Sequence, residues 1–579
     1  MKWVIAEQLK ADVYDLHKDL PPLMLQLLYN RGLKTAEAMY KFLNPDYVND
    51  LHDPFLFTDM DKAVNRIYAA FEKQEKIIIY GDYDADGICS SVVLSATFDK
   101  LQFSNYEVRL PHREKEGYGL NQAAIDEIIA SGATLVITLD CGTTNIQEVA
   151  RLADSKIDTI IVDHHVVGLE LPKAYAFVNP KRLDDTYPYK DLATVGLAFK
   201  LSSALFSRSA LPKQEVEIFL KWILDLVATA TVTDIVSLLG ENRVLLKYGL
   251  VVLNKTRRIG FKHLIESSSN TKKKSREITE HEIGFYIGPR INAASRMGHA
   301  ITAYNLLTAS DDEVAKPLIA ELDKHNKNRQ GLVSDVVKHA IDQISELDAQ
   351  KKVIVVFSEK CTAGIAGIVA SKIIDKYSRP VLVVGKGESG FVGSGRSVDG
   401  FHITNIINQL NIETQNSLFL RCGGHAKACG FTLNSIEDIG ILREKINNIA
   451  DTVLADFAFD KQINIDAVIN LDDVDLRLYK ELRKFEPHGM SNPKPKFLSK
   501  GVIISVLSQV GIGNKHLRLL VNSSETNQKR YKCIGFGLGQ IADSLAVGGQ
   551  ADIVFEIDID EWNGYTDIQL VLCDIRPAS

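Results

Sequence analysis

The chain has few cysteines and no pattern that would pair them. Seven cysteines are scattered over 579 residues, and an odd, dispersed set argues against a disulfide framework. This usage predicts a reducing compartment, the cytoplasm. Six residues separate Cys422 from Cys429, but no second pair accompanies them, so a zinc site is disfavoured.

Long apolar runs and net positive charge are also lacking. The start, MKWVIAEQLKADVYDL, has no long apolar core of the kind that a signal peptide needs. No uncharged run reaches the length of a membrane span. The 67 Lys and Arg residues are outnumbered by 74 Asp and Glu, which gives a net charge of −7. Any nucleic-acid ligand would therefore have to use local basic grooves.

An acidic turn, GDYDADG at Gly81–Gly87, follows the apolar run Lys76–Tyr80 and precedes a predicted helix at Ile88–Leu101. Three of its residues are carboxylates at the carboxyl end of the predicted strand: Asp82, Asp84 and Asp86. Open α/β sheets bind ligands at this edge. Like charges held this close raise one another's pKa unless a cation neutralises them. All-oxygen clusters favour Mg²⁺ or Mn²⁺.

Two more apolar runs end in polar residues. Thr134–Leu139 is followed by Asp140, and Asp158–Val162 is followed by Asp163, His164 and His165. Helical stretches at 121–130 and 145–153 separate these runs, and strands that alternate with helices predict a parallel sheet with both faces covered. Because parallel strands point the same way, the three polar loops should meet at one edge of the sheet.

A fourth candidate lies in Ile223–Leu239, an apolar run of 17 residues whose only charges are Asp225 and Asp234. It is too short and too acidic for a membrane span, so it predicts a core helix. Its carboxylates must then be paired or metal-bound. Asp225 could cap or hydrogen-bond locally, and Asp234, near the end of the run, is the better candidate ligand.

These motifs resemble the DHH phosphoesterase superfamily and, within it, the RecJ single-strand-specific exonucleases. GDYDADG, LDCG, VDHH and ATVTDIV match that family's successive metal motifs in order. Further matches continue almost to the end of the chain: RLPHREKEGYGL at 109–120, GPRINAASR at 288–296, AGIAGIVASK at 363–372, GSGRSVDGF at 393–401, GGHAKACGF at 423–431 and EPHGMSNPKPKF at 486–497. The ordered set is far more specific than any one motif.

Sequence pattern and resemblance together predict an α/β protein of several domains. The expected parts are a helical lead-in at 1–70, a parallel-sheet DHH metal-binding domain at 71–250, a linker region at 251–349, a second α/β DHH-associated domain at 350–454 and a carboxyl-terminal β-barrel of the OB-fold type at 455–579. The linker should contain an exposed connecting helix within Thr308–Leu347, where apolar periodicity is long and charges are many.

The second domain should bind substrate. Gly393–Ser397 and Gly423–His425 are predicted as small-residue turns that bring backbone N–H groups and a guanidinium to a phosphate. Ordinary glycine turns are the alternative. By resemblance, the substrate-binding residues are Arg290, Ser394, Arg396, Gly424 and His425. Cys361-Thr362 stands where the family usually has Trp-His, so contact by that histidine is absent or reassigned.

The barrel should hold single-stranded nucleic acid, since such barrels combine basic residues with stacking aromatics. Its candidate contacts are Lys515, His516, Arg518 and Phe536, although Phe536 could equally be a core residue.

For the metals, the resemblance implies two ions, Mn²⁺ or Mg²⁺. Asp140 would bridge them, with Asp82 and Asp84 on the first ion. Asp86, His164 and Asp234 would bind the second ion. His165 would contact a phosphate or donate a proton, and Asp163 would orient a histidine.

The expected function is a bacterial, cytoplasmic exonuclease that degrades single-stranded DNA from the 5′ end to mononucleotides in DNA repair and recombination. Its polarity follows from the resemblance alone. Expected partners are single-stranded DNA, a single-stranded-DNA-binding protein and a helicase, and a monomer is expected. Two alternatives stay open: a DHH phosphodiesterase that acts on short oligonucleotides or cyclic dinucleotides, and an inactive DNA-binding scaffold.

Overall fold

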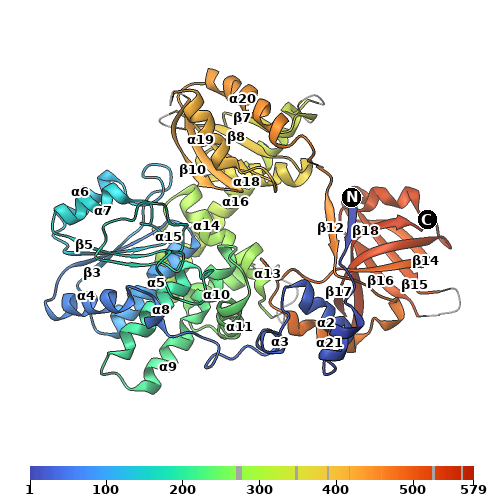
Figure 1. Cartoon of the computed structure of the whole chain (residues 1–579), viewed down its shortest axis with the longest axis horizontal. Coiled ribbons are helices and arrows are strands. Elements are labelled where there is room, and N and C mark those ends of the chain that lie inside the picture. The colour runs from blue at the N-terminus through green and yellow to red at the C-terminus, as the bar shows by residue number, and fades with distance from the viewer. Residues whose placement is uncertain are drawn as a thin grey trace. The chain divides into compact units, whose positions relative to one another are not determined.

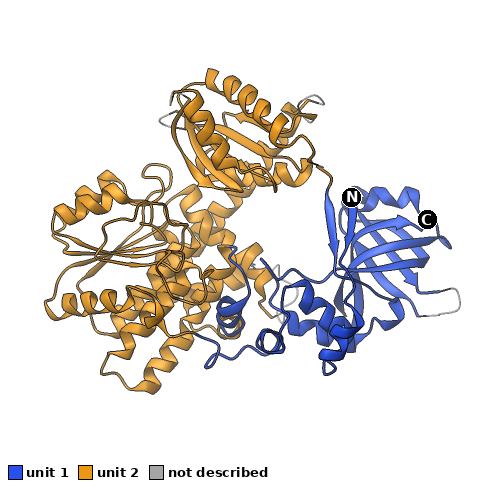
Figure 2. Ribbon diagram, in the orientation of Figure 1, with its two compact units in different colours: residues 1–51, 235–248, 461–579 blue, residues 52–234, 249–460 orange. Residues whose placement is uncertain are grey.

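The chain divides into two compact units in a computed structural model that describes residues 1–268, 277–345, 348, 350–387, 390–415, 418–457, 459–524, 529–562 and 565–578. One unit contains His52–Asp234 and Gly249–Asp460 (Figure 2). The other contains Met1–Leu51, Ile235–Tyr248 and Lys461–Ser579. The amino-terminal residues thus group with the end of the chain. Within the described ranges, no helix is both long and apolar enough to cross a membrane.

A five-stranded sheet forms the first α/β domain, and all its neighbouring strands are parallel, in the order β3-β2-β4-β5-β6 (Figure 1). The strands are β2 (Ile77–Gly81), β3 (Tyr106–Arg109), β4 (Leu135–Leu139), β5 (Asp158–Val162) and β6 (Ala176–Val178). Every residue of β2 and β4 is buried, as their largely apolar sequences predict. The predicted parallel sheet is confirmed.

Helices cover both faces of this sheet. Ile78 and Tyr80 of β2 share a core with residues of α6 (Gln122–Ala130) and α7 (Ile146–Asp154). On the opposite face, α5 (Ala85–Lys100) packs against β2 and also contacts α8 (Thr194–Ser207) and α10 (Leu224–Thr233). The chain passes from β2 outward to β3 and then returns to β4 on the other side of β2, so β2 and β4 flank the topological switch point where such sheets bind ligands.

The core helix predicted over Ile223–Leu239 is shorter than expected. α10 ends at Thr233, and Asp234 is its C-cap residue. The next residue, Ile235, has a φ of 59°, a left-handed conformation that a β-branched residue rarely adopts and that stops the helix. Asp234 consequently lies at a helix end and not within a helix.

The connecting helix, α16 (Asp312–Gln343), is 32 residues long and is capped by the Asp311 side chain. It was predicted as exposed, but a row of its side chains is buried, among them Leu322 and Val336. It packs against α14 (Gly288–Met297) and α15 (Ile301–Leu307) with its first part and against α18 (Ala363–Tyr377) with its second. The helix is therefore part of the cores that it joins.

The second α/β domain has a five-stranded sheet in the order β10-β11-β9-β8-β7. Its strands are β7 (Ile354–Ser358), β8 (Val381–Gly387), β9 (Gly390–Arg396), β10 (Phe419–His425) and β11 (Ala428–Leu433), and its helices besides α18 are α19 (Ile403–Glu413) and α20 (Glu437–Val453). The glycine-rich turns predicted at 393–397 and 423–425 were wrong, because most of these residues lie in β9 and β10. Their glycines leave room for neighbours: a Cβ on Gly393 would lie 2.2 Å from the Phe431 ring.

The other unit is built on a closed barrel. Its strands are β14 (Phe497–Val510), β15 (His516–Asn522), β16 (Tyr531–Gly535), β18 (Tyr565–Pro577) and β17 (Gln550–Trp562), and β17 pairs with β14 to close the ring. The predicted barrel is confirmed. Helices α2 (Pro22–Asn30) and α3 (Ala36–Leu43) share its apolar core. Strand β1 (Lys2–Ile5) pairs in parallel with β12 (Gln462–Ile465).

A buried arginine connects several segments of this unit by hydrogen bonds. Arg243 is 1% exposed, and its guanidinium donates to the carbonyl oxygens of Phe42, Lys484, Phe485 and Glu486. These bonds connect three segments that are far apart in the sequence.

Replacement of Arg243 by Ala should lower the free energy of unfolding of this unit by at least about 3 kcal/mol, because several buried carbonyls lose charged donors. Thermal and urea unfolding would measure the loss. Arg477→Ala, which removes an exposed guanidinium from the same unit, is the matched control. Equal stability of the two variants would contradict the role given to Arg243.

Candidate metal centre

Three polar loops meet at the carboxyl edge of the parallel sheet. The Asp82 N–H donates to the Leu139 carbonyl, the Asp140 N–H to the Val162 carbonyl and the Asp163 N–H to the Val178 carbonyl, at 3.0, 3.1 and 3.1 Å. The first residue of each loop therefore forms a hydrogen bond with the last residue of the neighbouring strand. The expected meeting of these loops at one edge is what the structure shows.

The carboxylates and imidazoles on these loops form three overlapping groups whose ligand atoms lie within 4.8 Å of one another. The groups are Asp82, Asp84 and Asp140; Asp140, His164 and His165; and Asp86, His164 and Asp234. All six residues predicted as metal ligands are thus brought together, and Asp140 and His164 each belong to two groups. Asp225 is excluded from them, since it accepts a hydrogen bond from Thr256 and lies 3.6 Å from Arg258 Nε.

The donor set suits divalent cations. Burial, together with the neighbouring carboxylates, raises the pKa of Asp82, Asp140 and Asp234 well above the usual value. Asp82 Oδ1, Asp234 Oδ2 and His164 Nδ1 are buried and have no hydrogen-bond partner. Such atoms are costly unless a ligand satisfies them. Oxygen donors with one or two imidazoles match Mn²⁺ or Mg²⁺ better than softer metals.

Two of the aspartates are held by helix N-termini. Asp84 caps α5 by accepting the N–H groups of Asp86 and Gly87. Asp86 accepts the N–H groups of Thr194 and Val195, at 2.7 and 2.8 Å, at the start of α8. These donors stabilise negative charge, yet burial and the nearby Asp84 still raise the pKa of Asp86 to about 7.

Asp140 is held in an unusual backbone conformation. Its φ is 65°, in the left-handed region that few non-glycine residues adopt. The Thr194 hydroxyl donates to Asp140 Oδ1 at 2.9 Å. This bond fixes the orientation of the carboxylate that two of the three ligand groups share. Thr194 was not predicted, because a threonine at a helix start in the sequence gives no sign of a distant carboxylate.

The two adjacent histidines have different environments. Burial and the neighbouring His165 lower the pKa of His164 to about 4, which leaves a neutral imidazole able to bind metal. Burial also acts on His165, but a 2.7 Å hydrogen bond with Asp163 prevails and raises its pKa. Asp163 also accepts the backbone N–H groups of both histidines. Tyr118, which was not predicted, places its hydroxyl 3.1 Å from His165 Nδ1.

The predicted substrate-binding residues fall into two groups: four lie on β9 and β10 of the second domain, and Arg290 lies on α14. Arg396 lies in β9 and donates to the Ser394 hydroxyl, and His425 and Gly424 lie in β10. Arg290 is engaged elsewhere: it forms a 2.8 Å ion pair with Asp323 and donates to the carbonyls of Tyr286 and Ser267. These contacts use three of its five donors, so its expected contact with a phosphate stays a prediction.

Four other arginines lie close enough to influence one another electrostatically. Burial, followed by the charges of Arg113 and Arg329, lowers the pKa of Arg296 to about 9. Arg113 also lies close enough to lower the pKa of Arg396, after the larger effect of burial. Arg296 Nε and Arg329 Nε are buried without a hydrogen-bond partner. Arg113, Arg296, Arg329 and Arg396, here called the arginine cluster, are therefore candidates to bind an anion. Arg113 and Arg296 lie within the motifs at 109–120 and 288–296. These motifs could have identified both arginines as candidate binding residues.

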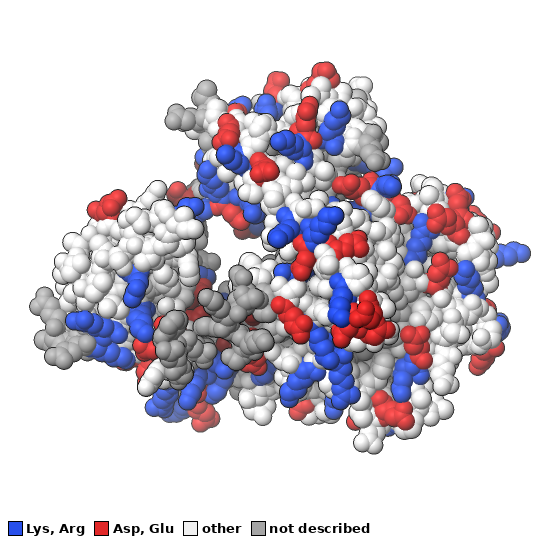
Figure 3. Space-filling model, turned by 180° about the vertical axis from the view of Figure 1, so that it is seen from behind, with Lys and Arg blue, Asp and Glu red and all other residues white. Residues whose placement is uncertain are grey.

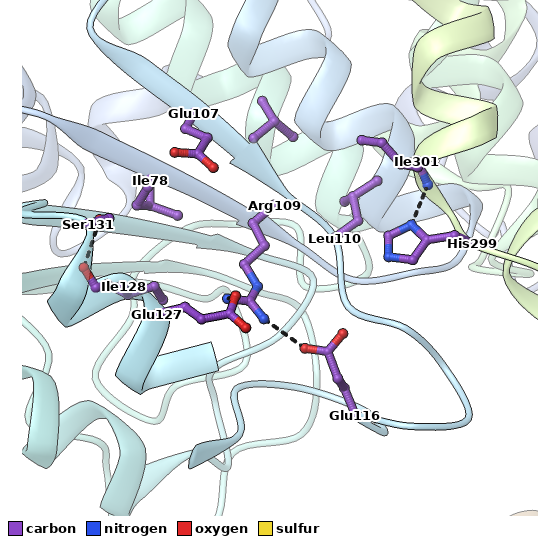
Figure 4. Close-up of a pocket in the computed structure, with 11 residues that line it drawn as sticks. Ile78, Glu107, Arg109, Leu110, Glu116, Glu127, Ile128, Ser131, His299 and Ile301 are labelled. Carbon is purple, nitrogen blue, oxygen red and sulfur yellow. Dashed lines mark hydrogen bonds and ion pairs between the residues drawn. The ribbon is translucent and has the colours of Figure 1, made fainter. Parts of the chain in front are cut away.

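A separate pocket of about 480 Å³ lies beside the edge strand β3 (Figure 4). Arg109 lies between Glu116 and Glu127 and forms ion pairs with both. None of the candidate metal ligands lines this pocket. Because its one arginine is already neutralised, it does not provide an anion site.

The barrel presents the predicted mixture of side chains. Phe536 is 65% exposed, so it is not a core residue. His516 lies edge-on to it with ring centroids 5.5 Å apart, and Lys515 and Arg518 are exposed. Basic and acidic side chains are interspersed on the face of the molecule in Figure 3, and the use of local basic grooves stays a prediction.

Comparisons with known proteins decide the family. Three family models match: the DHH family N-terminal domain over residues 76–231, the DHHA1 domain over 350–452 and the RecJ OB domain over 465–574. The single-stranded-DNA-specific exonuclease RecJ of Bacillus subtilis is 36% identical over 99% of this chain and 70% of its own length. The chain belongs to the RecJ family. RecJ of Escherichia coli is 28% identical over 97% of each chain.

Solved structures agree with this membership. The crystal structure of Thermus thermophilus RecJ in complex with Mn²⁺ matches with a TM-score of 0.83 and 25% identity, over 100% of this chain and 80% of that one. The corresponding Mg²⁺ complex matches with a TM-score of 0.76. The resemblance read from the motifs is confirmed, and the assignment of individual ligands stays a prediction.

Replacement of Asp140 by Ala should abolish tight Mn²⁺ binding, since Asp140 belongs to two of the three ligand groups. Isothermal titration of the folded, metal-free protein would measure it. Asp154→Ala removes an exposed carboxylate from the same domain and should leave binding unchanged. Equal Mn²⁺ affinity in the two variants would refute the assignment of Asp140 as a shared ligand.

Proposed function

We propose that the protein is a Mn²⁺- or Mg²⁺-dependent exonuclease that degrades single-stranded DNA from the 5′ end, releases mononucleotides and acts in DNA repair and recombination. The observation that carries this proposal is the buried constellation of carboxylates and imidazoles with atoms that lack partners, in the same unit as the arginine cluster. The names of the relatives support the substrate class and the polarity is an expectation from the family.

The six ligand residues would hold two ions, with Asp140 shared between them. When bound, two divalent ions would activate water and neutralise charge on the scissile phosphate. The chain's own contribution is rigidity: helix N-termini and the Thr194 hydroxyl fix the carboxylates before any ion arrives. Inactive-scaffold function is disfavoured because no ligand position is missing.

His165 would act on the substrate. Asp163 holds its Nδ1 and favours the protonated imidazole, as the raised pKa indicates. The His165 side chain is 43% exposed. A protonated ring in this position can donate a hydrogen bond or a proton to a phosphate oxygen. Asp163 itself is fully buried, which suits it to orient the histidine and not to contact DNA.

The arginine cluster would bind a phosphate of the strand, with Ser394 and the β10 backbone at Gly424 beside it. Guanidinium forks match phosphate oxygens. Burial, followed by Arg396 and His165, lowers the pKa of His425, so a neutral imidazole faces the same region. These contacts position the strand without reading its bases.

We expect a monomer that works in the bacterial cytoplasm with a single-stranded-DNA-binding protein and a helicase. The free cysteines agree with a reducing compartment.

A digestion panel tests the function. A long single strand labelled at its 5′ end, a blunt duplex of the same sequence, a dinucleotide and a cyclic dinucleotide are incubated with and without Mn²⁺. We expect Mn²⁺-dependent release of labelled mononucleotide from the single strand and resistance of the duplex. Asp140→Ala should abolish cleavage and keep strand binding within a few fold. Preferred cleavage of either dinucleotide would favour the short-substrate phosphodiesterase, and equal rates on duplex and single strand would reject single-strand specificity.

Replacement of Phe536 by Ala should weaken binding of a long single strand by about 1–3 kcal/mol, because base stacking on an exposed ring is lost. Cleavage of a dinucleotide should be spared. Tyr565→Ala, which removes another exposed ring of the barrel, is the control. Truncation of the barrel is unsuitable here, since α2 and α3 would lose their core. Unchanged affinity in Phe536→Ala would refute the stacking role.

A further inference from the structure

An aromatic turn precedes α14 and is not explained by the functions given above. The short helix α13 (Glu280–Glu282) runs into a π-helix, η2 (Ile283–Ile287). Ile283 and Ile287 are buried and anchor the turn. On its outer side Phe285 is 68% exposed, and the His281 ring stacks on it with centroids 4.6 Å apart at an interplanar angle of 26°. Single π-helical turns are rare and frequently mark functional sites.

The turn is fixed against the metal centre. A Cβ on Gly288, the residue after η2, would lie 2.0 Å from Thr233 Cγ2, and one on Gly284 would lie 3.8 Å from Val232 Cγ1. Val232 and Thr233 are the last residues of α10, directly before the candidate ligand Asp234. The backbone of the aromatic turn therefore packs on the helix end that presents a metal ligand.

The same segment continues to the arginine cluster. α14 begins at Gly288 and is 10 residues long, roughly 15 Å. Near its other end Arg296 belongs to the cluster and donates to the Gly364 carbonyl. One helix thus connects the arginine cluster with an exposed pair of stacked rings, and its first residue packs on Thr233, next to the candidate ligand Asp234.

We infer that His281 and Phe285 form a stacking platform for a base of the substrate strand, beyond the nucleotide that is cleaved. The inference rests on the proposed function. The stacked rings offer a flat apolar face that suits a base, whereas their neighbours Glu280 and Glu282 offer no cation to a phosphate. Stacking on a ring is tolerant of sequence, as a general exonuclease requires.

Replacement of Phe285 by Ala tests the platform in the full-length protein. We expect affinity for a long fluorescent single strand, measured by anisotropy in EDTA, to fall between about 5-fold and about 100-fold. Phe285→Trp should restore it. The dependence of affinity on salt should keep its slope, because no phosphate contact is lost, and Mn²⁺-dependent cleavage of a dinucleotide should not change. Tyr40→Ala removes a ring that is equally exposed, at 68%, and is the matched control.

Affinity of Phe285→Ala equal to that of the Tyr40→Ala control would overturn the inference, as would a reduced salt slope or an equal loss on the dinucleotide. Binding is measured without metal, so the outcome is independent of catalysis. Failure of the wild-type protein to cut a single strand in Mn²⁺ would instead refute the proposed function.

Discussion

The burial of several carboxylates at one edge of a parallel sheet is the constraint on which the structure depends. Asp82, Asp86, Asp140 and Asp163 are all nearly inaccessible to solvent, and isolated buried charges of this kind would neutralise. The fold offsets part of the cost with the N-terminus of α8, the Thr194 hydroxyl and the His165 imidazole. Bound cations would offset the remainder.

The sheet topology makes this concentration of charge possible. β2 and β4 are neighbours at the switch point, so the loops that follow them approach without an intervening strand. Asp234 arrives separately, from the end of α10, and reaches within 3.4 Å of His164 Nε2. Because α10 ends just before the left-handed residue Ile235, a helical segment can contribute one carboxylate to a site built from loops.

Two groups of opposite charge lie near each other within one unit. Carboxylates dominate the sheet edge, and the arginine cluster collects residues from a loop of the first domain, α14, α16 and β9. Cations and a phosphodiester together would complement both regions, since the ions neutralise the carboxylates and the phosphates neutralise the guanidiniums. The nearly balanced overall charge of the chain conceals this arrangement.

The sequence by itself determined the parallel sheet, the barrel, the family and the residues that gather as candidate ligands, because strand-end motifs in a parallel sheet must share an edge. It did not determine the end of α10, the strands formed by the glycine-rich segments or the partners of Thr194 and Tyr118. Arg290 and Arg296 lie in one motif, and only tertiary packing decided that Asp323 pairs with the first and that the second lies with the other arginines of the cluster. Local pattern sets which side chains are available, whereas contacts between distant segments decide which of them are already paired.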